Sequence, residues 1–209
     1  MSTYMGNSYK SILILLVSSI LVFSACDEPV FIFDPGMPGL PVFSKRGNDV
    51  AGAIINNTMI WNSMNYSSTI PVQCDTINNK LRLYFEGYLV NEDNHNNDDI
   101  YLIMEIETDK VKSFDDLVAL DQTKYDFTSP GNLAYIVIDE NNYDENFQPL
   151  NQKGNLTIRR SSSTGTNSDK IIFAGTFGYE YEDSFNLKYT VFQGRFDFTI
   201  RESGFYYKQ

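Results

Sequence analysis

The residues with the clearest chemical potential in this chain are oxygen ligands for a hard cation. The segment 91–99 (NEDNHNNDD) is the most polar stretch of the sequence. Four of its carboxylates are of the type that binds Ca²⁺: Glu92, Asp93, Asp98 and Asp99. The segment lacks the glycine and the spaced glutamate of an EF-hand loop, so a calcium site and a solvated hairpin loop are both open. A second acidic segment, 139–146 (DENNYDEN), has the same two interpretations.

Catalytic groups are harder to find. His95 is the only histidine, and it lies in the same polar segment with no neighbouring cysteine. A general base needs a positioned partner, so we expect His95 to be a surface residue. A carboxylate pair of the glycosidase type stays open because the chain has 27 acidic residues, although none stands in an apolar setting that would raise its pKa. The sequence therefore predicts no catalytic residue, no cofactor except the possible Ca²⁺, and a protein that is not an enzyme.

Aromatic residues make up 14% of the chain, with 15 Phe, 14 Tyr and 1 Trp. Exposed rings stack on sugars or fill protein interfaces, whereas tyrosine is also a common strand residue with a half-buried ring. In the strand expected over 170–182, Tyr179 and Tyr181 share one face and the glutamates beside them share the other. We predict that Tyr179 and Tyr181 form a ligand platform.

Charge and length limit the class of protein. The chain has 209 residues with 16 basic and 27 acidic side chains, which gives a net charge of −11. An acidic surface repels phosphates, so nucleic acid is not an expected partner. The hydrophobic fraction of 42% is enough for a packed core and argues against disorder.

The N-terminus carries an export signal. Lys10 is the only charge before Cys26, and an apolar run of 15 residues, 11–25, separates them. As a helix this run spans roughly 22 Å, which is short of the roughly 30 Å hydrocarbon core of a membrane. The small residues before Cys26 resemble a bacterial lipobox, although Phe23 stands where leucine is commoner. The resemblance implies that residues 1–25 are a lipoprotein signal peptide. An ordinary signal peptide cut after Ala25 and an uncleaved anchor are the alternatives.

Lipidation would decide where the protein resides. The resemblance implies that the thiol of Cys26 is acylated, with palmitate among its chains, and several acyl chains give a stable membrane anchor. Asp27 and Glu28 follow directly. In Bacteroidota lipoproteins such acidic residues resemble a signal for export to the cell surface, whereas in other Gram-negative bacteria aspartate here favours the inner membrane. We expect an outer-membrane lipoprotein on the periplasmic face or the cell surface. Cys74 is then unpaired, and we expect a buried apolar residue rather than a nucleophile.

The mature chain is dominated by strand patterns. Prolines and glycines over 26–48 are expected to break any regular element, so this segment is predicted to be a tether, followed by a single β domain over 49–209. Two short strands flank an Asn56-Asn57 turn, which is typical of a hairpin. The alternating segments are 80–91, 99–108, 133–139, 155–160, 170–182 and 188–202.

These patterns predict an all-β fold: an antiparallel β-sandwich or a strongly coiled, barrel-like sheet. At most one short helix is expected, near 113–120, where a serine precedes an aspartate by three residues. In 188–202 strict alternation places Tyr189 and Val191 on the face opposite Phe196 and Phe198.

Four short motifs extend the interpretation. They are Ala51–Trp61 (AGAIINNTMIW), Gly154–Ile158 (GNLTI), Ile172–Phe177 (IFAGTF) and Val191–Asp197 (VFQGRFD). In these motifs the chain resembles, over about residues 49–200, a family of uncharacterised Bacteroidota lipoproteins known only as a domain of unknown function. The resemblance implies an all-β lipoprotein and implies no reaction. Gly175 and Gly194 lie inside strand patterns, where glycine marks a bulge or a close backbone approach.

The sequence thus favours a lipid-anchored cell-envelope protein that binds a glycan or a protein, or that has a structural role. One alternative is a fimbrial or adhesin-type subunit, which would need a donated strand and proteolytic maturation. Lys45-Arg46 is a basic pair between the predicted tether and domain, a position suited to such cleavage. The other alternative is a hydrolase that depends on a carboxylate pair.

Overall fold

The fold is all-β, as the sequence predicts. A computed structural model describes residues 32–64, 70–90, 99–138, 144, 147–165 and 169–208. The strands are β1 (Phe33–Asp34), β2 (Met37–Pro41), β3 (Val50–Ile55), β4 (Met59–Met64), β5 (Val72–Asp75), β6 (Lys80–Val90), β7 (Asp99–Glu107), β8 (Lys124–Asp126), β9 (Leu133–Ile138), β10 (Leu150–Ser163), β11 (Lys170–Glu182), β12 (Lys188–Arg201) and β13 (Phe205–Tyr207). The short helix is a 3₁₀ helix, η1 (Asp115–Leu120), and a single 3₁₀ turn, η3 (Glu202–Gly204), precedes β13.

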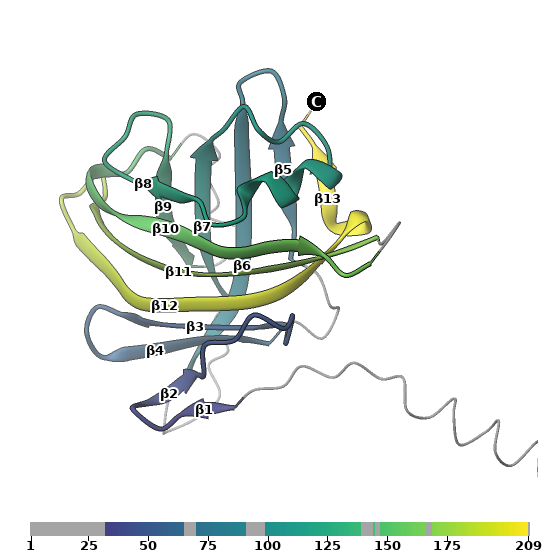
Figure 1. The fold of residues 1–209 in the computed structure, drawn as a ribbon. Coiled ribbons are helices and arrows are strands. Elements are labelled where there is room, and N and C mark those ends of the chain that lie inside the picture. The colour runs from purple at the N-terminus through teal and green to yellow at the C-terminus, as the bar shows by residue number, and fades with distance from the viewer. Residues whose placement is uncertain are drawn as a thin grey trace, which may run out of the picture.

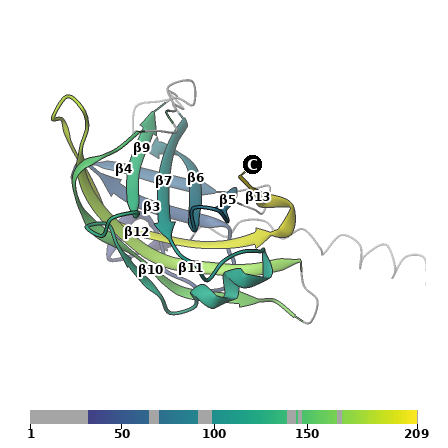
Figure 2. The ribbon, with the colours of Figure 1, turned by 90° about the horizontal axis from the view of Figure 1, so that it is seen from above.

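All strands except β1 and β2 belong to one sheet that curls into a half-barrel (Figures 1 and 2). The order β6-β4-β3-β12-β11-β10-β8 is antiparallel throughout. One edge of β6 pairs with β5 and then β4, and the other edge pairs with β7, which in turn pairs with β9. Of the predicted alternatives, the curled sheet is therefore the one that forms.

The predicted hairpin and the predicted alternation are both observed. Asn56 and Asn57 take φ angles of 49° and 68° between β3 and β4, a conformation that asparagine tolerates in tight hairpin turns. In β6 the side chains of Leu81, Leu83 and Phe85 are fully buried. A sheet with one buried face needs this two-residue period.

The core is built from aromatic rings that cross the half-barrel. The ring of Phe85 lies 5.2 Å from that of Phe196 and 5.6 Å from that of Phe198. Gly194 provides room, because a Cβ there would lie 2.4 Å from the ring of Phe177. Gly175 does the same, since its Cβ would meet the ring of Phe196 and the carbonyl of Thr157. The prediction that each glycine marks a bulge or a close approach is confirmed.

The predicted faces of β12 are wrong beyond its midpoint. Gln193 has a φ of 54°, and the register with β3 and with β11 shifts at this point. The extra residue of a β-bulge reverses which side chains point inward. Val191 is therefore buried together with Phe196 and Phe198, which strict alternation placed on the other face.

The predicted tether is also partly wrong, because residues 33–41 form the hairpin β1–β2 despite their prolines. This hairpin lies beside β3 and β4 at the lower end of the molecule in Figure 1. Leu40 is fully buried, and the Asp34 carboxylate accepts a hydrogen bond of 2.6 Å from the Arg195 guanidinium. The Arg195 hydrogen bond also holds the pKa of Asp34 below its usual value. The folded body therefore begins before residue 49.

Candidate ligand-binding cleft

Side chains from β10 and β11 cover the free edge of β9. The Tyr179 hydroxyl donates to the Tyr135 carbonyl at 3.3 Å, and the Ile136 amide donates to the Tyr181 hydroxyl at 3.1 Å. The Gln152 amide donates to the Ala134 carbonyl at 2.5 Å. An open strand edge invites pairing with other chains, and these bonds satisfy part of it without a further strand. They also fix the end of β11 against β9.

A cleft of about 340 Å³ opens where β9 and β11 end and β12 begins. Its volume is within the range of small-molecule sites. We call it the aromatic cleft. Its lining consists of Tyr135, Ile136, Val137, Ile138, Asp144, Phe147, Tyr181, Asp183, Phe185 and Tyr189.

Five of the ten lining residues are aromatic, and four of their rings contact one another. Tyr181 and Tyr189 stack with centroids 5.0 Å apart and an angle of 14° between the planes. Phe147 meets Tyr181 edge-on at 6.1 Å and lies 5.0 Å from Tyr135. Phe185, in contrast, is 81% exposed in the turn between β11 and β12. The cleft thus combines four rings that contact one another with a fifth ring, that of Phe185, which is exposed to solvent.

Asp183 is the fixed carboxylate of the cleft. Its Oδ1 accepts from the backbone amides of Phe185 at 2.8 Å and Leu187 at 2.9 Å, which makes the turn. Its Oδ2 lies 3.5 Å from the Tyr189 hydroxyl, a long contact that leaves this oxygen free for a ligand. Asp144 supplies a second, exposed carboxylate. The described residues that line the cleft include these two acids and no Lys, Arg or His.

Burial keeps the tyrosine hydroxyls of this region protonated. It raises the pKa of Tyr181 well above its usual range, and the negative charge of Asp183 adds to the effect. The pKa of Tyr189 is raised by the same two causes. The hydroxyls are therefore neutral donors and acceptors at physiological pH rather than anionic nucleophiles.

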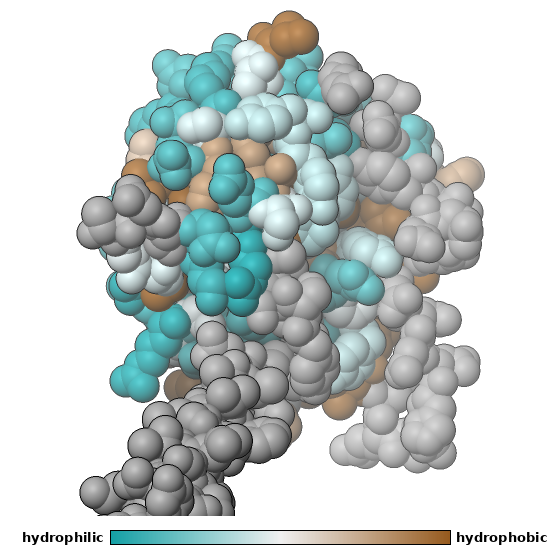
Figure 3. Space-filling model, turned by 90° about the vertical axis from the view of Figure 1, so that its right-hand side faces the viewer, coloured by the Kyte–Doolittle hydropathy of each residue, from teal (hydrophilic) through white to brown (hydrophobic). Residues whose placement is uncertain are grey.

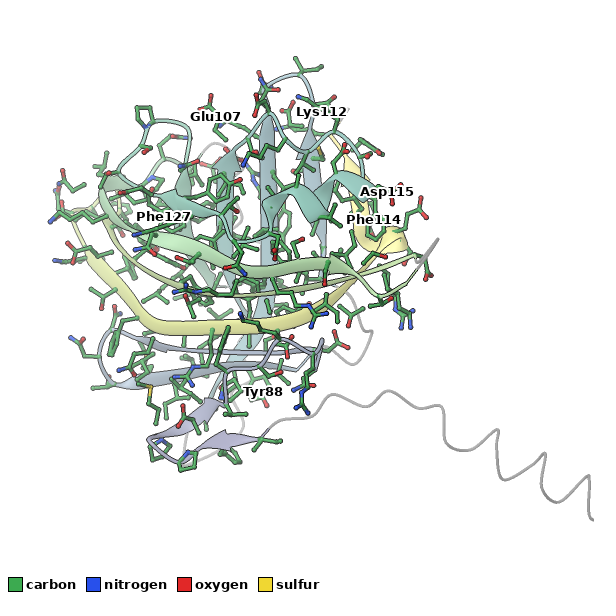
Figure 4. The ribbon with its side chains drawn as sticks, in the orientation of Figure 1. Tyr88, Glu107, Lys112, Phe114, Asp115 and Phe127 are labelled. Carbon is green, nitrogen blue, oxygen red and sulfur yellow. The ribbon has the colours of Figure 1, made fainter. Side chains whose placement is uncertain are left out.

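The structure separates the two predicted platform residues. Tyr179 and Tyr181 share one face of β11, as predicted, but this is the inner face, and the rings are only 4% and 3% exposed. Tyr179 packs edge-on against Phe127, which is labelled in Figure 4, and belongs to the core. The prediction that both rings form an open platform is therefore wrong. Tyr181 lines the aromatic cleft, and its binding of a ligand stays a prediction.

The sequence interpretation missed most of the cleft. Phe147, Asp183 and Phe185 were not candidates, because the bulge in β12 and the curl of the sheet bring them together. Phe185 had one available signal: it is a large apolar residue within a polar turn (DSFN), a position that polar residues and glycine usually take.

A second cleft, of about 440 Å³, lies over β5, β6 and β7 and is polar. We call it the polar cleft. The Glu105 carboxylate, 5% exposed, accepts from Lys80 at 2.5 Å and from Arg82 at 2.6 Å. Glu107, labelled in Figure 4, lies at its rim. The side of the molecule that carries β5 and β13 is mostly hydrophilic, with separate hydrophobic areas (Figure 3).

One acid does stand in an apolar setting, contrary to the sequence interpretation. Asp49 is buried, and burial raises its pKa to about 6, with the nearby charge of Asp197 adding to the rise. Asp49 Oδ1 accepts from the Thr199 amide at 2.7 Å, and Asp197 Oδ1 accepts from the Gly47 amide at 2.7 Å. Both carboxylates thus tie the segment before β3 to β12.

The predicted calcium ligands fall largely outside the described residues. Glu92, Asp93, Asp98 and His95 lie there, as does the side chain of Asp99, which begins β7. Within the described part of the chain no group of three or more His, Cys, Asp or Glu side chains is placed to hold a metal ion.

The two cysteines have different outcomes. Cys26 lies outside the described residues, so its acylation stays a prediction. Cys74 is a buried free thiol, as predicted, 3.5 Å from the Val111 carbonyl, and burial raises its pKa.

No protein-family model, curated protein or solved structure matches the chain. Among the described residues, no helix has both the length and the apolar character that crossing a membrane requires. The resemblance to Bacteroidota lipoproteins stays a prediction from the sequence.

Proposed function

We propose that this chain is a lipid-anchored protein of the outer membrane that binds a glycan in its aromatic cleft and catalyses no reaction. The observation that carries the proposal is the cleft itself: five aromatic rings and two carboxylates at one end of a rigid sheet. Aromatic rings pack against the apolar faces of sugars, and carboxylate oxygens accept hydrogen bonds from sugar hydroxyls. Asp183 and the Tyr181–Tyr189 stack supply both kinds of contact from side chains that are already fixed.

The proposed anchor and the observed fold are compatible in space. Seven Cα–Cα steps separate Cys26 from Phe33, the first residue of β1, and seven extended steps reach at most about 25 Å. A lipid on Cys26 would therefore keep the β1–β2 end of the molecule near the membrane. Metabolic labelling with an alkyne analogue of palmitate tests the anchor: label on the wild type and none on Cys26→Ser support it, and equal label on both contradicts it.

The glycan proposal is tested with the full chain in a polyoxyethylene detergent, which has no sugar headgroup to compete. The thermal midpoint is measured with neutral trisaccharides of N-acetylglucosamine, glucose and galactose. A ligand at 100 times its Kd adds about 2.7 kcal/mol to the free energy of unfolding, which is readily detected. At least one sugar is expected to raise the midpoint.

Variants locate the binding. Tyr189→Ala should abolish the rise, because it removes the half-buried member of the ring stack, which is more accessible than Tyr181. Tyr206→Ala is the matched control, since Tyr206 is an exposed tyrosine on β13, away from the cleft. A flat response to every sugar, or equal loss in both variants, would contradict the proposal.

A further inference from the structure

The open end of the β1–β2 hairpin exposes a group of apolar side chains. The Val42 amide donates to the Ile32 carbonyl at 2.6 Å, so the two ends of the hairpin lie side by side. Ile32 and Phe33 are 55% and 62% exposed, and Val42 and Phe43 are each 36% exposed. We call these four residues the apolar stem. Apolar side chains that gather on a surface mark a site of contact with a partner or a membrane.

The hairpin that carries the apolar stem is fixed to the sheet. Leu40 is fully buried. The Arg195 guanidinium donates to the Asp34 carboxylate at 2.6 Å and to the Pro41 carbonyl at 3.0 Å. These contacts use the side of the hairpin that meets the sheet. The stem is therefore presented on a fixed support.

The charges beside the stem suit an anionic surface. Asp34 is the only charged residue of β1 and β2, and it pairs with Arg195. Lys45 and Arg46 follow the stem directly, and both are exposed. The Arg46 amide donates to the Asp197 carboxylate at 3.1 Å, which holds this basic pair close to the stem. Basic residues beside apolar ones are typical of surfaces that contact anionic lipid headgroups.

The proposed lipid lies close to the stem along the chain. Six Cα–Cα steps separate Cys26 from Ile32, and six fully extended steps reach at most about 22 Å. An acyl chain on Cys26 would therefore keep the stem within reach of the headgroups. Of the surfaces of the domain, this one is thus placed by the anchor itself.

We infer that the apolar stem and the pair Lys45-Arg46 form a membrane-contact surface that lies on a bilayer with anionic headgroups. This inference rests on the proposed lipid anchor and names the surface of the domain that meets the membrane. The apolar side chains would enter the boundary between headgroups and acyl chains, and the two cations would lie at the level of the phosphates. The contact would fix the orientation of the domain.

Tryptophan fluorescence tests the contact. The full chain is reconstituted into vesicles of phosphatidylethanolamine and phosphatidylglycerol, with and without bromine on the acyl chains. Trp61, the only tryptophan, is fully buried, and its emission in the unmodified chain is subtracted. The added emission of Phe43→Trp should fall about twofold in the brominated vesicles, because a side chain at this boundary lies beside the acyl chains. Ile32→Trp should behave in the same way.

The control for position is Ile77→Trp. Ile77 is exposed in the turn between β5 and β6, and this turn lies at the opposite end from β1–β2 in Figure 1. Its emission should be the same in both kinds of vesicle. Equal quenching at residues 43 and 77 would overturn the inference, because the domain would then have no fixed side toward the bilayer.

Charge variants test the anionic headgroups. Lys45→Gln/Arg46→Gln should weaken the quenching of Phe43→Trp, since each cation near an anionic surface adds to the attraction. Lys110→Gln/Lys124→Gln is the matched control, because it removes the same charge from exposed residues after β7 and on β8, away from β1–β2 in Figure 1. Equal quenching in both double variants would overturn anionic headgroups as the partner.

The outcomes separate the inference from the proposed anchor, which palmitate labelling reports independently. A labelled chain that floats with the vesicles but shows no quenching at residues 32 and 43 would overturn the inference and leave the anchor standing. A blue shift of the Phe43→Trp emission without quenching would also overturn it, because another protein would then cover the stem. A chain that carries no label and does not float would overturn both.

Discussion

The aromatic cleft and the polar cleft have similar volumes and use their charged side chains differently. In the polar cleft Glu105 meets Lys80 and Arg82 at 2.5 and 2.6 Å, so charge is neutralised within the protein. In the aromatic cleft Asp183 uses one oxygen to build a turn and leaves the other available. Buried ion pairs stabilise or specify a fold, whereas exposed aromatic rings favour a ligand. The difference assigns a structural role to the polar cleft and binding to the aromatic one.

The largest effect on stability should come from removing the shared carboxylate of the polar cleft. Glu105→Gln would remove the nearly buried carboxylate that Lys80 and Arg82 share, at a cost of about 3 kcal/mol in the free energy of unfolding. Urea titration measures it. Glu180→Gln is the matched control, since Glu180 also has two cationic partners, Lys153 and Lys188, but is 30% exposed, and its cost should be much smaller. Equal costs would remove the contrast between buried and exposed pairs.

A third carboxylate sharpens the comparison because it is buried yet remote from both clefts. The pKa of Asp49 is raised to about 6, so the folded protein holds this proton between about pH 4 and pH 6, where the unfolded chain has lost it. The contribution of Asp49 to stability therefore falls as the pH rises through that window. Asp49→Asn keeps the acceptor for the Thr199 amide and should add about 2 kcal/mol at pH 8 and almost nothing at pH 4. Urea titrations at the two pH values measure this, and an equal gain at both would contradict the raised pKa.

A smaller effect is expected where the aromatic cleft meets the β9 edge. Tyr181→Phe removes the hydroxyl that accepts from the Ile136 amide and keeps the ring in its stack. The free energy of unfolding should fall by about 1 kcal/mol, while sugar affinity stays within about twofold. Calorimetry and urea titration on the same variant give both numbers. A large loss of affinity without loss of stability would mean that the hydroxyl itself contacts the ligand.

The smallest effect on stability should come from Phe185→Ala. Its ring is 81% exposed, so the free energy of unfolding should change by less than about 0.5 kcal/mol. Sugar affinity, in contrast, should fall about fivefold, because the ring closes the mouth of the cleft. Ile77→Ala is the control, as Ile77 is equally exposed in the turn after β5 and should change neither quantity. Unchanged affinity in Phe185→Ala would confine the site to the inner rings.

The sequence predicts the strands well, because a sheet with one buried face imposes a two-residue period. Leu81, Leu83 and Phe85 follow that period without interruption, and the Asn56-Asn57 turn requires residues that tolerate a positive φ. The hairpin at 33–41 escaped prediction because its stability comes from contacts far along the chain, such as the one between Asp34 and Arg195.

The candidate site could not be predicted in the same way. Strict alternation extends only as far as the next bulge, and Gly194 indicated a bulge or a close approach without deciding between them, so the reversal of faces at Gln193 could not be predicted. The inner face of β11 was also indistinguishable from an outer one, because tyrosine occurs on both. The sequence indicates Tyr181 as a candidate but gives no reason to place Tyr189 against it, since their stacking depends on the pairing of β11 with β12.

The most direct test of the binding site is the position of the ligand on the protein. Uniformly ¹⁵N-labelled full chain in polyoxyethylene detergent is titrated with the neutral trisaccharide that raises the thermal midpoint, and the amide resonances are followed. The amides of Asp183, Phe185 and Tyr189 should shift, while those of Gln73 and Glu105 in the polar cleft should stay unchanged. Shifts confined to the polar cleft would contradict the assignment of binding to the aromatic one.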